Sequence, residues 1–134
     1  MAGPVLVDTS VWVDALRDPR SRVTPGIEAL LAGTVRLATT GLIVQEVLQG
    51  ISVPADLARV GTLMRHVPCL GATRDTHMRA ASLYRGLRRA GVTVPTVDVV
   101  IAQLAIDHGV PVWSLDRHFA RIARASRLRL YTAR

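Results

Sequence analysis

Short apolar segments of strand length alternate with segments of helical character along the 134 residues of the chain. Their length and the turn residues around them are typical of buried β-strands. Such strands are predicted at residues 4–7, 35–39, 67–70, 112–115 and 128–131. Strands that alternate with helices favour an α/β sandwich with a largely parallel central sheet.

The helices are predicted from residues that begin and end them. Thr24-Pro25 supplies a cap and a proline at the first helical position, and Gly33, Gly91 and Gly109 each end a helix. The first helix is expected to follow directly on Asp8-Thr9-Ser10, and the others to cover residues 24–33, 40–49, 54–66, 75–90, 96–108 and 117–124.

The length of the chain fits one compact domain over residues 1–134. No apolar stretch reaches the roughly 18 residues that a membrane span needs, and no secretory signal is evident, so we expect a cytoplasmic protein with no membrane contact. Cys69 is the single cysteine, which excludes an internal disulfide and a multi-cysteine zinc site. A buried, inert thiol is the expected role of Cys69.

The net charge of +7 comes from 17 basic residues, all of them arginine. Arginine suits phosphate recognition because its planar group donates two hydrogen bonds to one phosphate, so the charge favours a nucleic-acid partner. Arginine codon usage in a GC-rich genome explains the same composition equally well. Arg85, Arg88 and Arg89 share one face of the predicted helix 75–90 and are either phosphate contacts or a solvated surface. The absence of lysine excludes a P-loop and Schiff-base chemistry.

Two of the ten acidic residues directly follow predicted strands. Asp8 comes after the strand 4–7, and Asp116 comes after the strand 112–115. Ligands of open parallel sheets gather beyond the carboxyl ends of the strands, so these two side chains are expected to converge there. Two serines accompany them: Ser10 and Ser114 are candidates to hold an acid in place or to bind a metal-bound water.

Asp98 lies in the first turn of the predicted helix 96–108, where the helix dipole favours a carboxylate. Helical spacing also places it on the stripe of Ile101 and Ala102, opposite Gln103, so Asp98 is expected to face inward. A buried carboxylate requires a partner, a proton or a metal. Glu46 falls at the edge of the apolar face of the helix 40–49, and by itself that position indicates a surface residue.

Four acids that meet would repel one another, which arginine or a divalent cation would relieve. Mg²⁺ or Mn²⁺ takes oxygen ligands and would polarise a scissile phosphate and help to generate a hydroxide nucleophile. Histidine is not expected among the ligands, because the four histidines lack close metal-binding spacing and are expected to be surface or partly buried residues: His66, His77, His108 and His118. Trp12 and Trp113 are expected in the core rather than as stacking platforms for bases.

Four segments of the sequence resemble the PIN domain, and within this family the VapC-type toxins. They are residues 5–12 (VLVDTSVW), 40–48 (TGLIVQEVL), 94–102 (VPTVDVVIA) and 114–119 (SLDRHF). The resemblance implies a three-layer α/β/α sandwich and a catalytic quartet of Asp8, Glu46, Asp98 and Asp116. It also implies an endoribonuclease that depends on Mg²⁺ or Mn²⁺ and acts on structured RNA such as transfer or ribosomal RNA, a homodimer, and inhibition by a cognate antitoxin.

Within this resemblance Asp8, Asp98 and Asp116 would be the principal metal ligands, with Glu46 binding through water or positioning the nucleophile. Some relatives carry a further acid right after the last aspartate, where this chain has Arg117. Two other classes remain open: a phosphoaspartyl-type hydrolase, which the missing lysine disfavours, and a non-catalytic RNA-binding or protein-interaction domain whose acids only cap helices.

Overall fold

In the computed structural model, which describes residues 3–33 and 36–132, a sheet of four parallel strands has the order β3-β2-β1-β4. The strands are β1 (Val5–Val7), β2 (Leu37–Thr40), β3 (Cys69–Leu70) and β4 (Val112–Trp113). They confirm four of the predicted strands. Three of them are shorter than predicted, and β2 extends to Thr40, which was predicted to begin the next helix. Val35, where that strand was predicted to start, lies outside the described residues.

The order of the strands creates a reversal next to β1. The chain passes from β1 to β2 and on to β3 in one direction, then returns to place β4 against the free edge of β1. Leu6 therefore pairs with Ala38 of β2 on one side and with Val112 of β4 on the other. A crevice opens at such a reversal, beyond the carboxyl ends of the two strands.

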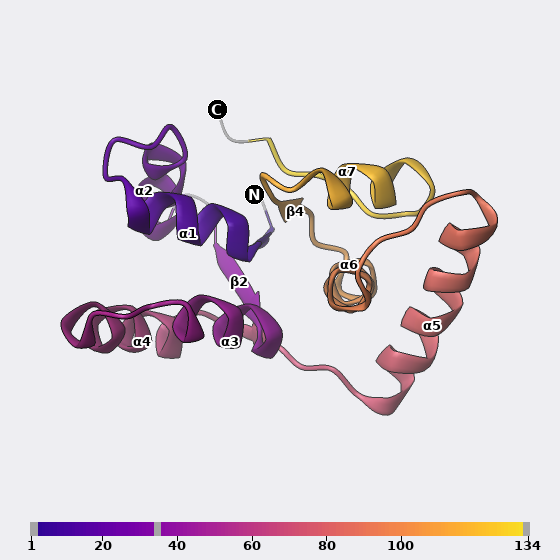
Figure 1. Cartoon of the computed structure of the whole chain (residues 1–134), viewed down its shortest axis with the longest axis horizontal. Coiled ribbons are helices and arrows are strands. Elements are labelled where there is room, and N and C mark those ends of the chain that lie inside the picture. Colours follow the sequence, from indigo (N-terminus) through magenta and orange to yellow (C-terminus); the bar gives the residue numbers. More distant parts are fainter. Residues whose placement is uncertain (1–2, 34–35, 133–134) are drawn as a thin grey trace.

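Helices cover both faces of the sheet. Their bounds are α1 (Thr9–Arg17), α2 (Thr24–Leu31), α3 (Gly41–Gln49), α4 (Pro54–His66), α5 (Arg74–Arg89), α6 (Thr96–His108) and α7 (Arg117–Arg124). In Figure 1, α1 to α4 gather on one side of the sheet, and α5 to α7 lie on the other. The predicted three-layer α/β/α sandwich is confirmed.

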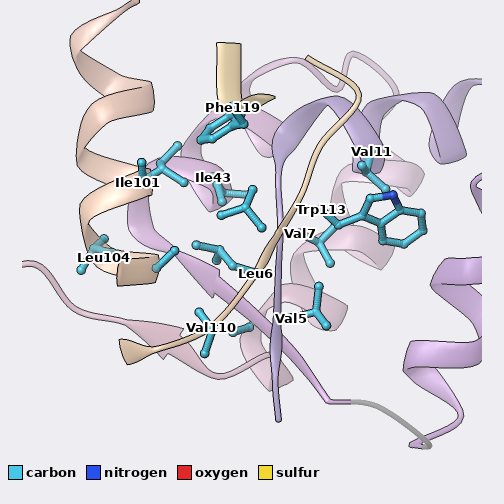
Figure 2. Close-up of a cluster of buried hydrophobic side chains, with 14 of the residues drawn as sticks. Val5, Leu6, Val7, Val11, Ile43, Ile101, Leu104, Val110, Trp113 and Phe119 are labelled. Carbon is cyan, nitrogen blue, oxygen red and sulfur yellow. The ribbon is translucent and has the colours of Figure 1, made fainter. Parts of the chain in front are cut away.

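The core lies on both faces of β1. Figure 2 shows Leu6 directed toward the side of α6, where Ile101 lies, while Val5 and Val7 point to the opposite side. All three strand residues are at most 1% exposed. This alternation follows from the two-residue period of a strand, and it buries both faces as parallel sheets require. Trp12 and Trp113 are buried, as predicted.

Three expectations are wrong. The segment 128–131 forms no strand, because β4 is only two residues long and leaves room for a single bridge, Val112 to Leu130. Cys69 is exposed rather than buried, because β3 is an edge strand of the sheet. Gln103, which the helical stripe placed on the side of α6 away from the core, is buried, because α6 is covered by α5 and α7 as well as by the core.

No helix within the described ranges is both long enough and apolar enough to cross a membrane.

Candidate metal centre

Asp8 is held at the carboxyl end of β1 by two serines. Its Oδ2 accepts hydrogen bonds from Ser10 Oγ and from Ser114 Oγ, both at 2.8 Å. Asp8 also caps the N-terminus of α1, and only 5% of the residue is exposed. A carboxylate with two hydroxyl donors on one oxygen is fixed in orientation, so the two serines hold the Asp8 side chain in place.

The two serines also join the end of β1 to the end of β4. Their hydroxyl oxygens lie 3.2 Å apart, although 104 positions separate them in the chain. Ser10 Oγ accepts from the backbone N–H of Leu115 at 3.0 Å, and Ser114 Oγ accepts from that of Asp116 at 2.9 Å. The position of Asp116 relative to Asp8 is therefore set by hydrogen bonds through both hydroxyls.

Asp98, Asp116 and His118 form the second part of the site. His118 Nδ1 lies 2.9 Å from Asp98 Oδ2 and 3.2 Å from Asp116 Oδ1. Asp116 caps the N-terminus of α7 by accepting from the backbone N–H of His118 at 2.9 Å. One donor atom of each of the three residues lies within 4.8 Å of the others, the arrangement of a metal-binding cluster.

Burial raises the pKa of the Asp98 carboxyl above its ordinary value, and the negative charges of Asp8 and Asp116 raise it further. The hydrogen bond from His118 opposes this shift without cancelling it. Asp98 is thus mostly buried, as its helical stripe predicted; 16% of its side chain is exposed. A divalent cation between these carboxylates would relieve the repulsion.

Glu46 contacts the site through Thr9. Thr9 Oγ1 donates to Glu46 Oε1 at 3.1 Å and ties α3 to the first turn of α1, next to Asp8. Glu46 is half-buried. Neither Glu46 nor Asp8 belongs to the cluster of Asp98, Asp116 and His118. The hydrogen bond from Thr9, next to Asp8, places the Glu46 side chain at the border of the site.

His118 is the residue that the sequence interpretation missed. Its spacing from the other histidines carries no signal, since its partners are acids. A signal did exist: His118 lies two residues after Asp116, in the first turn of a helix that Asp116 caps. That position brings the imidazole close to the capping carboxylate.

The donor set fits a hard or borderline divalent cation. It offers carboxylate oxygens and one imidazole nitrogen, both accepted by ions of the Mg²⁺ and Mn²⁺ type or by later transition metals. Among the described residues, no arginine forms an ion pair with Asp8, Glu46, Asp98 or Asp116. The sequence left two ways to relieve the repulsion among the four acids, arginine or a divalent cation. Within the described part of the chain, arginine does not neutralise them.

Comparison with known proteins agrees with this geometry. The sequence model of the PIN domain matches residues 5–125. The chain is 35% identical over 127 residues to Ribonuclease VapC11 of Mycobacterium tuberculosis, an alignment that covers 92% of this chain and 95% of that protein. All four predicted acids fall within the matched range.

Solved structures share the fold. The crystal structure of VapBC2 from Rickettsia felis, bound to a DNA fragment from its promoter, superposes with a TM-score of 0.78 at 15% identity, covering 96% of this chain and 97% of that one. VapBC-5 from Mycobacterium tuberculosis, a member of the VapBC family of toxin-antitoxin systems, gives a TM-score of 0.69 at 26% identity and covers 99% and 100% of the two chains.

Proposed function

The chain belongs to the PIN domain family, and from this premise we propose that it is a metal-dependent endoribonuclease, the toxin of a toxin–antitoxin pair. One observation of the structure carries the proposal. Asp8, Asp98 and Asp116 come from three distant parts of the chain and meet at the reversal of strand order between β1 and β4. Capping alone does not require that the three carboxylates face one another.

Asp8, Asp98 and Asp116 would hold the metal ion, Mg²⁺ or Mn²⁺. A bound ion supplies Lewis acidity, which neutralises charge on a scissile phosphate and favours ionisation of an attacking water. The chain's own residues do the rest. Ser10 and Ser114 keep Asp8 oriented, and Glu46, fixed by Thr9 at the border of the site, would accept a hydrogen bond from the attacking water and orient it.

We assign the contacts to the RNA backbone to Arg85, Arg88 and Arg89 on α5. All three are exposed, and among the described residues none of them is ion-paired with an acid. Arg88 lies over the ring of Tyr84, 6.0 Å from its centre, and its Nη1 donates to the Tyr84 hydroxyl at 3.3 Å. Exposed guanidinium groups on one helix suit phosphates of a structured RNA such as transfer or ribosomal RNA.

An apolar pocket supports a protein partner. It has a volume of about 280 Å³, lies between α1, α3 and α4, and is lined in part by Leu16, Val47, Ile51 and Val60. Half of the surface of Val53, at the same pocket, is exposed. Burial of this apolar surface would stabilise the complex with a cognate antitoxin.

We also propose that the protein is a cytoplasmic homodimer.

Cleavage of RNA tests the proposed function. Purified protein is incubated with total transfer RNA or ribosomal RNA and Mn²⁺, and the products are separated by denaturing electrophoresis. Asp8→Asn and Asp98→Asn are expected to lower the cleavage rate at least about 100-fold, because each removes a charged ligand. Chelation of the metal should stop cleavage by the unaltered protein.

Asp75→Asn is the matched control, because Asp75 lies in the first turn of α5 as Asp98 does in α6, yet it is exposed and remote from the cluster. It should cleave at the unaltered rate. Equal cleavage by all four proteins would mean that a contaminating nuclease acts, and the proposal would be rejected. RNA binding without cleavage by any of them would instead indicate a binding module.

A further inference from the structure

We propose that His118 is itself a ligand of the metal ion, so that the centre is a mixed carboxylate–imidazole site that binds Mn²⁺ more tightly than Mg²⁺. The inference rests on the proposed function, which supplies the metal. It adds a residue that the family resemblance did not include among the site residues, and it changes the chemistry of the donor set.

The distances around His118 Nδ1 fit coordination. Adjacent ligand atoms of an octahedral ion with bonds of about 2.1 Å lie about 3 Å from one another. Nδ1 lies 2.9 Å from Asp98 Oδ2 and 3.2 Å from Asp116 Oδ1. Each of these two distances is that of neighbouring positions around a single ion, and the three residues together form a cluster that could hold one.

A positioning role, in which Nδ1–H only donates to Asp98, explains the 2.9 Å distance, and the capping of α7 already brings the Asp116 carboxylate near the ring. A single N–H points at one acceptor, whereas Nδ1 lies between two carboxylates. Ligating histidines donate their remaining N–H to a carboxylate, a carbonyl or water, and 33% of the His118 side chain is exposed to solvent.

The backbone of His118 is held independently of the ring. Its N–H donates to Asp116 Oδ1 in the capping hydrogen bond of α7. Phe119, the next residue, is 1% exposed and anchors the same turn in the core. The imidazole is therefore presented to the two carboxylates by a rigid element, as a ligand must be.

Metal preference follows from the nitrogen donor. Mg²⁺ favours oxygen ligands in a near-ideal octahedron and gives up its water reluctantly, whereas transition-metal ions accept imidazole nitrogen readily. A nitrogen ligand from His118 in place of an oxygen ligand should thus weaken the binding of Mg²⁺ more than the binding of Mn²⁺. The same argument predicts that removal of the imidazole reduces the difference in binding affinity between Mn²⁺ and Mg²⁺.

Pulsed electron paramagnetic resonance of the Mn²⁺-loaded full-length protein tests the proposal, because it detects a nitrogen nucleus bonded directly to Mn²⁺. We expect a nitrogen signal in the unaltered protein. Its presence shows that an imidazole is bound to Mn²⁺, and the variants show whether that imidazole belongs to His118. His118→Asn should abolish the signal, since an amide nitrogen does not coordinate but still donates a hydrogen bond to Asp98. His77→Asn, at an exposed position of α5, should retain it.

Affinities measured by titration give a second readout. His118→Asn should weaken Mn²⁺ binding about tenfold and Mg²⁺ binding about threefold or less. Bound Mn²⁺ without a nitrogen signal, or unchanged affinities in His118→Asn, would overturn the inference while RNA cleavage leaves the proposed function intact. No Mn²⁺ binding together with no cleavage would overturn both.

Discussion

At the scale of single residues, the carboxylate of Asp98 is the least favourable charge of the site. It is mostly buried and lies near two further acids, Asp8 and Asp116. Without a cation its ionised form is destabilised, which is why the pKa of Asp98 is raised from the ordinary value of 3.8. The site therefore costs the metal-free protein stability at neutral pH.

Asp98→Asn is expected to raise the Tm of the metal-free protein by a few degrees near neutral pH. An Asp whose folded pKa is raised contributes stability below its ordinary pKa, and this contribution is lost as pH rises through the raised pKa. The gain in the variant should therefore shrink as the pH falls from about 7 toward about 4. Thermal unfolding followed by circular dichroism at several pH values checks this.

Asp75→Asn controls for the loss of one negative charge and should leave Tm nearly unchanged. With saturating Mn²⁺ the unaltered protein should instead have a higher Tm than Asp98→Asn, because only the unaltered site gains the full free energy of metal binding. A metal-free Asp98→Asn protein that melts below the unaltered one would contradict the repulsion argument.

The sequence analysis identified three of the acids of this site and missed the histidine. Asp8, Asp98 and Asp116 were singled out by position, since each follows a strand or faces the core. Glu46 depended on the family resemblance, and the structure places it at the border of the site through Thr9. His118 was missed because its place two residues after the capping Asp116 was overlooked, and its other partner, Asp98, lies 20 positions away in the chain.

At the scale of elements, α6 carries the site residue Asp98 in its first turn and is held in place toward its other end. The helix ends at Gly109, whose φ of 63° lies in the left-handed region and whose N–H bonds to carbonyls of the last turn. On its outer side α6 is tied to α5 by Arg79, which donates to Asp107 at 2.7 Å, and Gln103 donates to the same carboxylate at 2.8 Å. This ion pair lowers the pKa of Asp107.

Gly109→Ala and Gly61→Ala are expected to change stability in opposite directions. Added Cβ atoms meet nothing within 4 Å at either position, so only the backbone conformation differs. Alanine at Gly109 should cost about 1 kcal/mol because its Cβ disfavours positive φ. Alanine at Gly61, inside α4, should gain about 0.5–1 kcal/mol because glycine weakens a helix interior.

Denaturant unfolding of the two variants measures both free energies against the unaltered protein. The two substitutions act as mutual controls, since each adds one methyl group to open space. A gain at Gly109 would show that α6 does not end in a left-handed residue.

At the scale of the whole molecule, arginines supply all of the positive charge apart from histidine and the chain terminus. The exposed set Arg85, Arg88 and Arg89 lies on α5, at the opposite side of the molecule from α4 in Figure 1. Their role as phosphate contacts stays a prediction. It has a distinct thermodynamic signature, because neutralised phosphates release counterions.

Replacement of all three arginines by alanine, in the inactive Asp8→Asn background, should weaken RNA binding and reduce its salt dependence. The slope of log affinity against log salt is expected to fall by about 2 to 3, since each phosphate contact contributes about 0.7 on single-stranded and about 0.9 on double-stranded nucleic acid. Fluorescence anisotropy with a labelled RNA at several salt concentrations measures the slope. Arg65→Ala on α4 removes an exposed arginine elsewhere and should leave the slope unchanged.

The sequence by itself determined which segments form helices and four of the strands, and which acids stand at their ends. These features depend on neighbouring residues: caps, glycines and apolar runs act within a few positions. It misjudged segment 128–131 and Cys69, because strand length in the partner and place in the sheet are properties of the assembled fold.

Only the tertiary structure decided how the acids meet and what joins them. The strand order places β4 beside β1, which brings Ser114 to Ser10 across 104 positions and both hydroxyls onto Asp8. The packing of α6 against α7 likewise brings Asp98 to His118. Such contacts are set by topology and burial rather than by spacing along the chain, so no local pattern contains them.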